Sequence, residues 1–141
     1  MSDRLLLVLT GDRQVGLSVE PLVEVRDLGQ PFPVPAATAA MRGVIEVRRR
    51  MLPVFHLGVA LEGGTCPDRL GQMAVVAEVA GRALCLEVDY ASEVTRETIR
   101  PWSDEDILPG AVGVVERAGI YVPIIDLTVL GPQLLDSGNA R

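Results

Sequence analysis

Few side chains of this chain could carry covalent or metal chemistry. His56 is the only histidine, Cys66 and Cys85 are the only cysteines, and all thirteen basic residues are arginines. The lack of lysine excludes a phosphate-loop lysine, a Schiff-base lysine and a serine–lysine dyad. No serine lies in a Gly-x-Ser-x-Gly elbow, so a hydrolase triad is not indicated. The sequence therefore predicts neither an enzyme nor a bound cofactor.

The histidine and the cysteines also have simple structural interpretations. One histidine and two cysteines are too few for the common zinc sites, unless the fold brings His56, Cys66 and Cys85 together. His56 lies in an apolar run and is expected to be a partly exposed strand residue. Cys85 lies in the middle of a predicted strand and is expected to fill space in the core. We predict no metal site.

One basic cluster stands out, formed by Arg48-Arg49-Arg50 with Arg42 nearby. The whole chain has a net charge of −6, and aromatic side chains that could stack on bases are scarce near the cluster. Nucleic acid is therefore not an expected partner. The cluster indicates either a solvated hairpin turn or contact with an acidic protein surface.

The composition favours a β protein. The chain has 141 residues, of which 48% are apolar and 4% aromatic. Twenty of them are valines, and β-branched side chains pack well on a pleated surface. A chain of this length forms one domain, or two very small ones that share a core.

Paired apolar runs with glycine-containing turns predict three hairpins. They span residues 5–19, 73–88 and 112–126, with turns at Gly11, Ala80-Gly81 and Ala118-Gly119. The last two hairpins resemble each other enough to indicate a weak internal duplication. Further strands are predicted over residues 23–26, 41–47 and 51–57.

Helix is expected in only two places. Residues 35–41 are rich in alanine and predict about two turns after a proline. Residues 127–135 have helical spacing, but Gly131-Pro132 should break or bend that helix. Residues 61–72 and 101–110 have the glycine and proline content typical of loops. Many short strands with little helix predict an all-β barrel or sandwich.

No segment predicts export or membrane insertion. The apolar run at residues 5–9 is too short for a signal-peptide core or a membrane span. Two cysteines without a secretion signal are typical of a reducing compartment. We therefore expect a soluble cytoplasmic protein that does not insert into the membrane directly.

The segment from Gly43 to Leu57 resembles the CheW family of chemotaxis coupling proteins. The family's central stretch has a Gly-Val pair, then Asn-Leu-Arg-Gly, and three residues later Pro-Val-x-Asp-Leu. The residues in register with that pattern are Gly43, Val44, Arg48, Pro53, Val54 and Leu57. The hairpins before and after this segment resemble the family as well, so the likeness extends through most of the chain.

The resemblance implies a single domain over residues 1–141, built from two intertwined five-stranded SH3-like barrels with little helix. The hairpin at residues 5–19 would complete the C-terminal barrel, and residues 22–88 would form the middle barrel. The implied function is that of a cofactor-free adaptor in cytoplasmic receptor arrays. It would join the tips of methyl-accepting receptors to the regulatory domain of a CheA-type histidine kinase, with other CheW-like proteins as further expected partners.

The resemblance also assigns binding positions. The positions expected to bind receptor or kinase are Leu22, Glu24, Arg26, Gly43 and Arg48. A second region expected to contact the kinase contains Glu46, Arg49, Trp102 and Gly113. The Arg48 guanidinium could hold two loops together through carboxylates, with Glu24 as a candidate partner. The alternative is a solvated Arg48–Glu24 pair worth less than about 1 kcal/mol.

The chain departs from the family pattern where Glu46, Arg49 and His56 replace Asn, Gly and Asp. Because a β-carbon makes positive φ costly, we expect a different turn shape at residues 48–51. Residues 101–110, in a region that helps to contact the kinase, look shorter than usual. An alternative is therefore a divergent adaptor that binds receptors and modulates array clustering without binding the kinase. A small β-barrel enzyme or ligand carrier is a weaker alternative, because no pocket with convergent polar groups is indicated.

Overall fold

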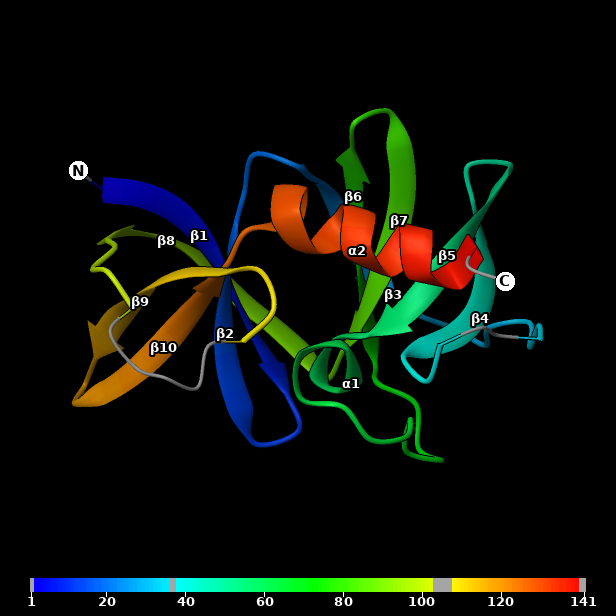
Figure 1. Ribbon diagram of the computed structural model, residues 1–141, viewed down its shortest axis with the longest axis horizontal. Coiled ribbons are helices and arrows are strands. Elements are labelled where there is room, and N and C mark those ends of the chain that lie inside the picture. Colours follow the sequence, from blue (N-terminus) through cyan, green and yellow to red (C-terminus); the bar gives the residue numbers. More distant parts are fainter. Residues whose placement is uncertain (1, 36–37, 103–107, 140–141) are drawn as a thin grey trace.

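Two five-stranded sheets make up most of the molecule (Figure 1). The computed structural model describes residues 2–35, 38–102 and 108–139. The first sheet contains β1 (Ser2–Thr10), β2 (Arg13–Ser18), β8 (Tyr90–Thr98), β9 (Ala111–Arg117) and β10 (Ile120–Ile125), in the order β8-β1-β2-β10-β9. The second contains β3 (Leu22–Asp27), β4 (Met41–Val47), β5 (Arg50–His56), β6 (Met73–Val79) and β7 (Arg82–Val88), in the order β3-β6-β7-β5-β4. The predicted mostly β fold with two five-stranded sheets is confirmed.

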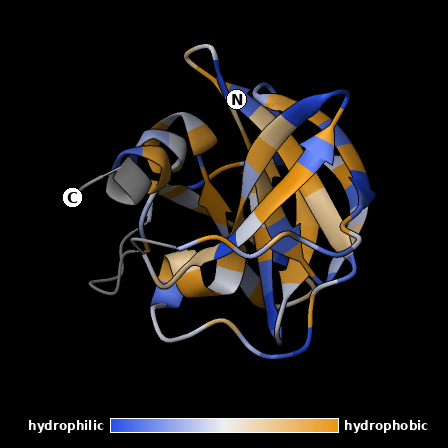
Figure 2. Ribbon diagram, turned by 90° about the vertical axis from the view of Figure 1, so that its right-hand side faces the viewer, coloured by the Kyte–Doolittle hydropathy of each residue, from blue (hydrophilic) through white to orange (hydrophobic). Residues whose placement is uncertain are grey.

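The largest hydrophobic core lies between the two sheets. Leu6 and Val8 of β1 contribute to it from the first sheet, and Leu84, Leu86 and Val88 of β7 contribute from the second. The opposite faces of these central strands are also buried, since Leu5 packs inside the first sheet and Cys85 inside the second. Burial on both faces explains why these strands are nearly continuous apolar runs. Figure 2 shows many hydrophobic segments, in orange, among the strands of the molecule.

The two sheets repeat one arrangement of strands. In each sheet a central hairpin, β1–β2 or β6–β7, pairs in parallel with a second hairpin, β9–β10 or β4–β5, through β10 or β5. The two sheets therefore repeat one arrangement, but the predicted match between the hairpins at Ala80-Gly81 and Ala118-Gly119 is wrong. The hairpin at Ala80-Gly81 corresponds to the one at Gly11, and the hairpin at Ala118-Gly119 corresponds to β4–β5.

The described residues form two helices, α1 (Leu57–Glu62) and α2 (Leu127–Asn139). Helix α1 lies where strand and loop were predicted. Helix α2 runs through Pro132 without ending there, because Leu127, Leu130 and Leu134 pack into the central core and offset the lost backbone hydrogen bond. Figure 1 shows α2 lying across β6 and β7.

Two other expectations need correction. The helix predicted over residues 35–41 is wrong for its described part, since residues 38–40 form a bend and a turn and Met41 begins β4; residues 36–37 lie outside the described residues. Strand β8 was missed because its polar sequence lacks apolar alternation. Among the described residues, no helix is long and apolar enough to cross a membrane.

Candidate functional site

Strand β3 is an edge strand whose charged side chains point inward. Glu24 and Arg26 are half-buried, whereas Val23 and Val25 are 52% and 38% exposed. This reverses the usual pattern of a one-sided sheet, in which apolar residues face the core. Inward-pointing charges disfavour pairing of an edge with another strand, and the exposed valines leave an apolar strip on the outer face of β3.

An ion-pair network joins β3 to the turn between β4 and β5. The Arg48 Nη2 lies 3.4 Å from Glu24 Oε1, and Arg26 Nη1 lies 4.0 Å from Glu24 Oε2. The Arg48 side chain is 72% exposed and that of Glu24 25%. Among the described residues, Glu24 Oε2 and Arg26 Nε have no hydrogen-bond partner. The network is too exposed and too long to contribute more than about 1 kcal/mol to stability.

The β4–β5 turn has the tight form that glycine would favour, despite having arginine at both positions. Arg48 has φ 52° and Arg49 has φ 70°. Both arginines adopt positive φ because the two strands pair up to Val47 and Arg50 and leave only these two residues to reverse the chain. The expected difference from the family's turn stays a prediction. Left-handed conformations of non-glycine residues cost of the order of 1 kcal/mol each.

Gly43 and Gly113 occupy corresponding positions in the two sheets, and both are buried. A β-carbon on Gly43, which has φ 152°, would fall on the carbonyl oxygen of Phe32. A β-carbon on Gly113 would lie 2.6 Å from the carbonyl oxygen of Arg100. Both glycines thus allow a passing segment to pair with the edge strand beside them.

The expected binding residues fall into two groups. Leu22, Glu24, Arg26, Gly43, Glu46, Arg48 and Arg49 all belong to the second sheet and its β4–β5 turn. Trp102 follows β8, and Gly113 lies in β9 of the first sheet. The residues expected to contact the kinase are therefore divided between the sheets. Residues 103–107 of the segment expected to be shortened, 101–110, lie outside the described residues.

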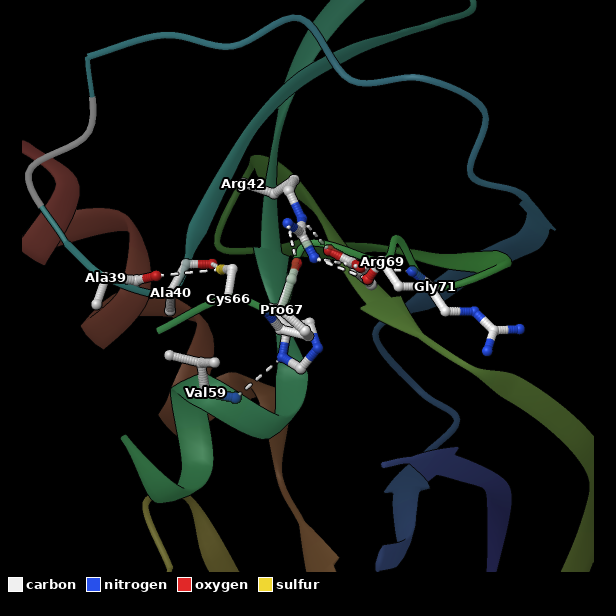
Figure 3. Close-up of polar contacts among 10 residues, drawn as sticks. Ala39, Ala40, Arg42, Val59, Cys66, Pro67, Arg69 and Gly71 are labelled. Atoms are coloured by element: carbon white, nitrogen blue, oxygen red, sulfur yellow. Dashed lines mark hydrogen bonds and ion pairs between the residues drawn. The ribbon is translucent and has the colours of Figure 1, made fainter. Parts of the chain in front are cut away.

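Sequence reasoning missed a buried ion pair between Arg42 and Glu87 (Figure 3). Arg42 Nε and Nη2 each donate to a Glu87 carboxylate oxygen at 2.9 Å, and the backbone N–H of Gly71 donates to the same carboxylate at 2.6 Å. Arg42 Nη1 also donates to the carbonyl oxygen of Pro67 at 2.7 Å. The hydrogen bonds that Arg42 donates to Glu87 raise the pKa of Arg42. The pair fixes the loop between α1 and β6 against the sheet.

Figure 3 also shows the hydrogen bond that begins helix α1. The backbone N–H of Val59 donates to Nδ1 of His56 at 3.1 Å, so His56 is the N-cap of this helix. Burial lowers the pKa of His56. Asp126 is the N-cap of α2, because its carboxylate accepts a hydrogen bond from the backbone N–H of Thr128 at 2.9 Å.

The two cysteines have structural roles that are separate from that of His56. The Cys66 thiol donates to the carbonyl oxygen of Ala39 at 3.2 Å, and Cys85 is buried in the core of the second sheet, as expected. Burial raises the pKa of Cys85 to about 11. Within the described ranges, no three or more His, Cys, Asp or Glu side chains are grouped so as to hold a metal ion.

Comparisons with known proteins agree on one family. The model of the CheW-like domain matches residues 4–130. Chemotaxis protein CheW of Rhizobium meliloti (strain 1021) is 29% identical over 134 residues, which cover 87% of this chain and 83% of that protein. The crystal structure of scaffolding protein TtCheW from Thermoanaerobacter tengcongensis matches with a TM-score of 0.79 at 20% identity, covering 92% of each chain. This last likeness extends the agreement to the fold.

Proposed function

The chain belongs to the CheW-like family, and on this basis we propose that it is a non-enzymatic adaptor of a bacterial chemosensory system. It couples the cytoplasmic tips of methyl-accepting receptors to the regulatory domain of a CheA-type histidine kinase. It acts within receptor arrays on the cytoplasmic side. Contacts of this kind are individually weak and gain strength because many of them form together.

The observation that carries the proposal is the network of Glu24, Arg26 and Arg48. The Arg48–Glu24 pair joins the edge strand to the turn at 3.4 Å, and Arg26 lies 4.0 Å from the same carboxylate within β3. The same strand exposes Val23 and Val25 on its other face. An exposed apolar strip and an exposed guanidinium, the latter being the Arg48 side chain, suit the surface of an amphipathic helical hairpin. We assign Leu22, Glu24, Arg26 and Arg48 to receptor binding, with Gly43 shaping the adjacent edge.

A second candidate is an adaptor that binds receptors but not the kinase. The observation in its favour is that Glu46 and Arg49 lie on one sheet, whereas Trp102 and Gly113 belong to the other. Gly113 is also buried, so its role is to let Arg100 approach β9. The residues expected to contact the kinase are thus divided between the two sheets.

The test is a pair of calorimetric titrations of the purified chain. One titration uses a receptor signalling-hairpin fragment, and the other uses the kinase regulatory domain, after both fragments have been shown to bind a known coupling protein. The proposal expects binding to both. Binding to the receptor fragment alone selects the second candidate, and binding to neither rejects both.

The first mutational prediction concerns Arg48. Arg48→Ala should weaken binding of the receptor fragment by about fivefold or more, because it removes a charged group from the proposed contact. Its melting temperature should stay within about 2 °C of the unmutated protein, since the exposed pair contributes little to folding.

Arg100→Ala is the matched control for Arg48→Ala. Arg100 forms an ion pair with Glu116 at the same 3.4 Å distance, but on the first sheet. This control should bind the receptor fragment normally. Equal weakening in both variants, or a large loss of melting temperature in Arg48→Ala, would reject the assignment of Arg48 to the receptor contact.

A further inference from the structure

In the part of the chain that the structure describes, three hairpins reverse through two residues that both have positive φ. In two of them a glycine fills the second position, Gly81 with φ 80° and Gly119 with φ 79°. In the third hairpin Arg49 fills the second position with φ 70°. The chain thus uses glycine twice for this backbone conformation, and at the β4–β5 turn it has a residue that strains it.

Among the described residues, no ion pair of the Arg49 side chain offsets this strain. Its neighbours are paired, since Arg48 lies 3.4 Å from Glu24 and Arg50 lies 3.6 Å from Glu78. Arg49 is exposed and forms no ion pair with any residue that the structure describes. A strained backbone conformation that no interaction within the protein offsets indicates that the residue is kept for a function.

The surroundings of Arg49 indicate the chemistry of its ligand. The turn presents three consecutive arginines on a chain whose net charge is −6, and the carboxylates of Glu24 and Glu78 are already engaged with the first and third. The guanidinium of Arg49 is therefore available to bind an anionic group of a partner molecule. An arginine fork recognises a carboxylate through two parallel hydrogen bonds.

We propose that Arg49 is a specificity-determining residue, which binds a carboxylate on the receptor hairpin next to the contact made by Arg48. This inference rests on the proposed function. It commits to the receptor because Arg48 and Arg49 form one two-residue turn, so a partner that covers Arg48 lies beside Arg49. Trp102 and Gly113, by contrast, belong to the other sheet.

The decisive variant is Arg49→Gly, which removes the charge and the strain together. The melting temperature should rise by about 2 °C, since glycine adopts positive φ without steric cost. Affinity for the receptor hairpin fragment should fall about fivefold at low ionic strength. The difference should shrink towards zero at about 1 M salt, where exposed charges are screened. A variant that gains stability while losing affinity separates this proposal from a merely structural role.

Two controls complete the experiment. Arg49→Lys keeps a positive charge and should retain part of the affinity, and Arg96→Ala removes an exposed arginine from β8 of the other sheet and should bind normally. If the unmutated chain fails to bind the fragment, the proposed function falls. If it binds and Arg49→Gly binds equally well, only the role of Arg49 is rejected.

Two further outcomes would also overturn this inference. A weakened affinity of Arg49→Gly for the kinase regulatory domain, with normal receptor binding, would reject the receptor as the ligand of Arg49. A lower melting temperature in Arg49→Gly would reject the strain on which the argument depends.

Discussion

At the scale of single residues, Glu87 shows how a buried charge can be accommodated. Its side chain is completely buried, and its carboxylate accepts two hydrogen bonds from Arg42 and one from Gly71. A buried carboxylate without such partners would lose the stabilisation it has in water. The pair therefore holds the loop before β6 in place. Removing the Glu87 carboxylate would leave the positive charge of Arg42 without its partner.

We predict that Glu87→Gln lowers the free energy of unfolding by about 3 kcal/mol, because it breaks a buried pair from one side. Urea denaturation measures the change. Glu78→Gln is the control, since Glu78 also pairs with an arginine but its side chain is 50% exposed; it should cost less than about 1 kcal/mol. Equal losses in the two variants would contradict the role given to Glu87.

Among the secondary-structure elements, one strand of each sheet leads directly into a helix that has a side-chain cap. Strand β5 ends at His56, which caps α1, and strand β10 is followed by Asp126, which caps α2. At α1 the acceptor is an imidazole nitrogen, whereas at α2 it is a carboxylate oxygen. Unlike a carboxylate, this acceptor is lost when the side chain gains a proton near neutral pH.

The cap makes stability depend on pH. Because burial lowers the pKa of His56 in the folded chain, the unfolded chain binds a proton more readily, and stability should fall as pH drops below about 6.5. Glu87, Arg42 and Asp89 also act on this group. His56→Asn keeps a neutral cap at every pH, so between pH 7.5 and pH 5.5 it should lose less stability than the unmutated chain. Denaturation curves with equal pH dependence would contradict this prediction.

At the scale of the whole molecule, the central core makes the two sheets depend on each other. Val15 and Leu17 of β2 share this core with Val75 and Ala77 of β6, and Leu130 of α2 packs against it from the end of the chain. The cores inside the sheets are smaller. Neither sheet can therefore lose its packing without exposing the apolar face of the other.

We predict that the chain unfolds in one cooperative transition. Leu84→Ala in β7 of the second sheet should lower the free energy of unfolding by about 3 kcal/mol. The same shift should be seen in the fluorescence of Trp102, which follows β8 of the first sheet, and in far-ultraviolet circular dichroism. A fluorescence transition that does not move with the circular dichroism would show that the sheets unfold separately.

The sequence by itself determined the strands with strong apolar alternation, such as residues 73–79 and 82–88, and the turns between them. These depend on neighbouring residues and on the two-residue period of a strand. The resemblance of residues 43–57 to a known family supplied the type of fold and the binding positions. Which positions bind remains a prediction.

Only the tertiary structure decided the remaining features, because they depend on residues far apart in the chain. Arg42 and Glu87 are 45 positions apart, so the sequence around each of them does not predict that they form an ion pair. Helix α2 continues through Pro132 because of its packing on the central core, and Gly43 is required by the approach of Phe32. The positive φ of Arg49 follows from the pairing of β4 with β5, since strand pairing can impose a backbone conformation that the residue itself disfavours.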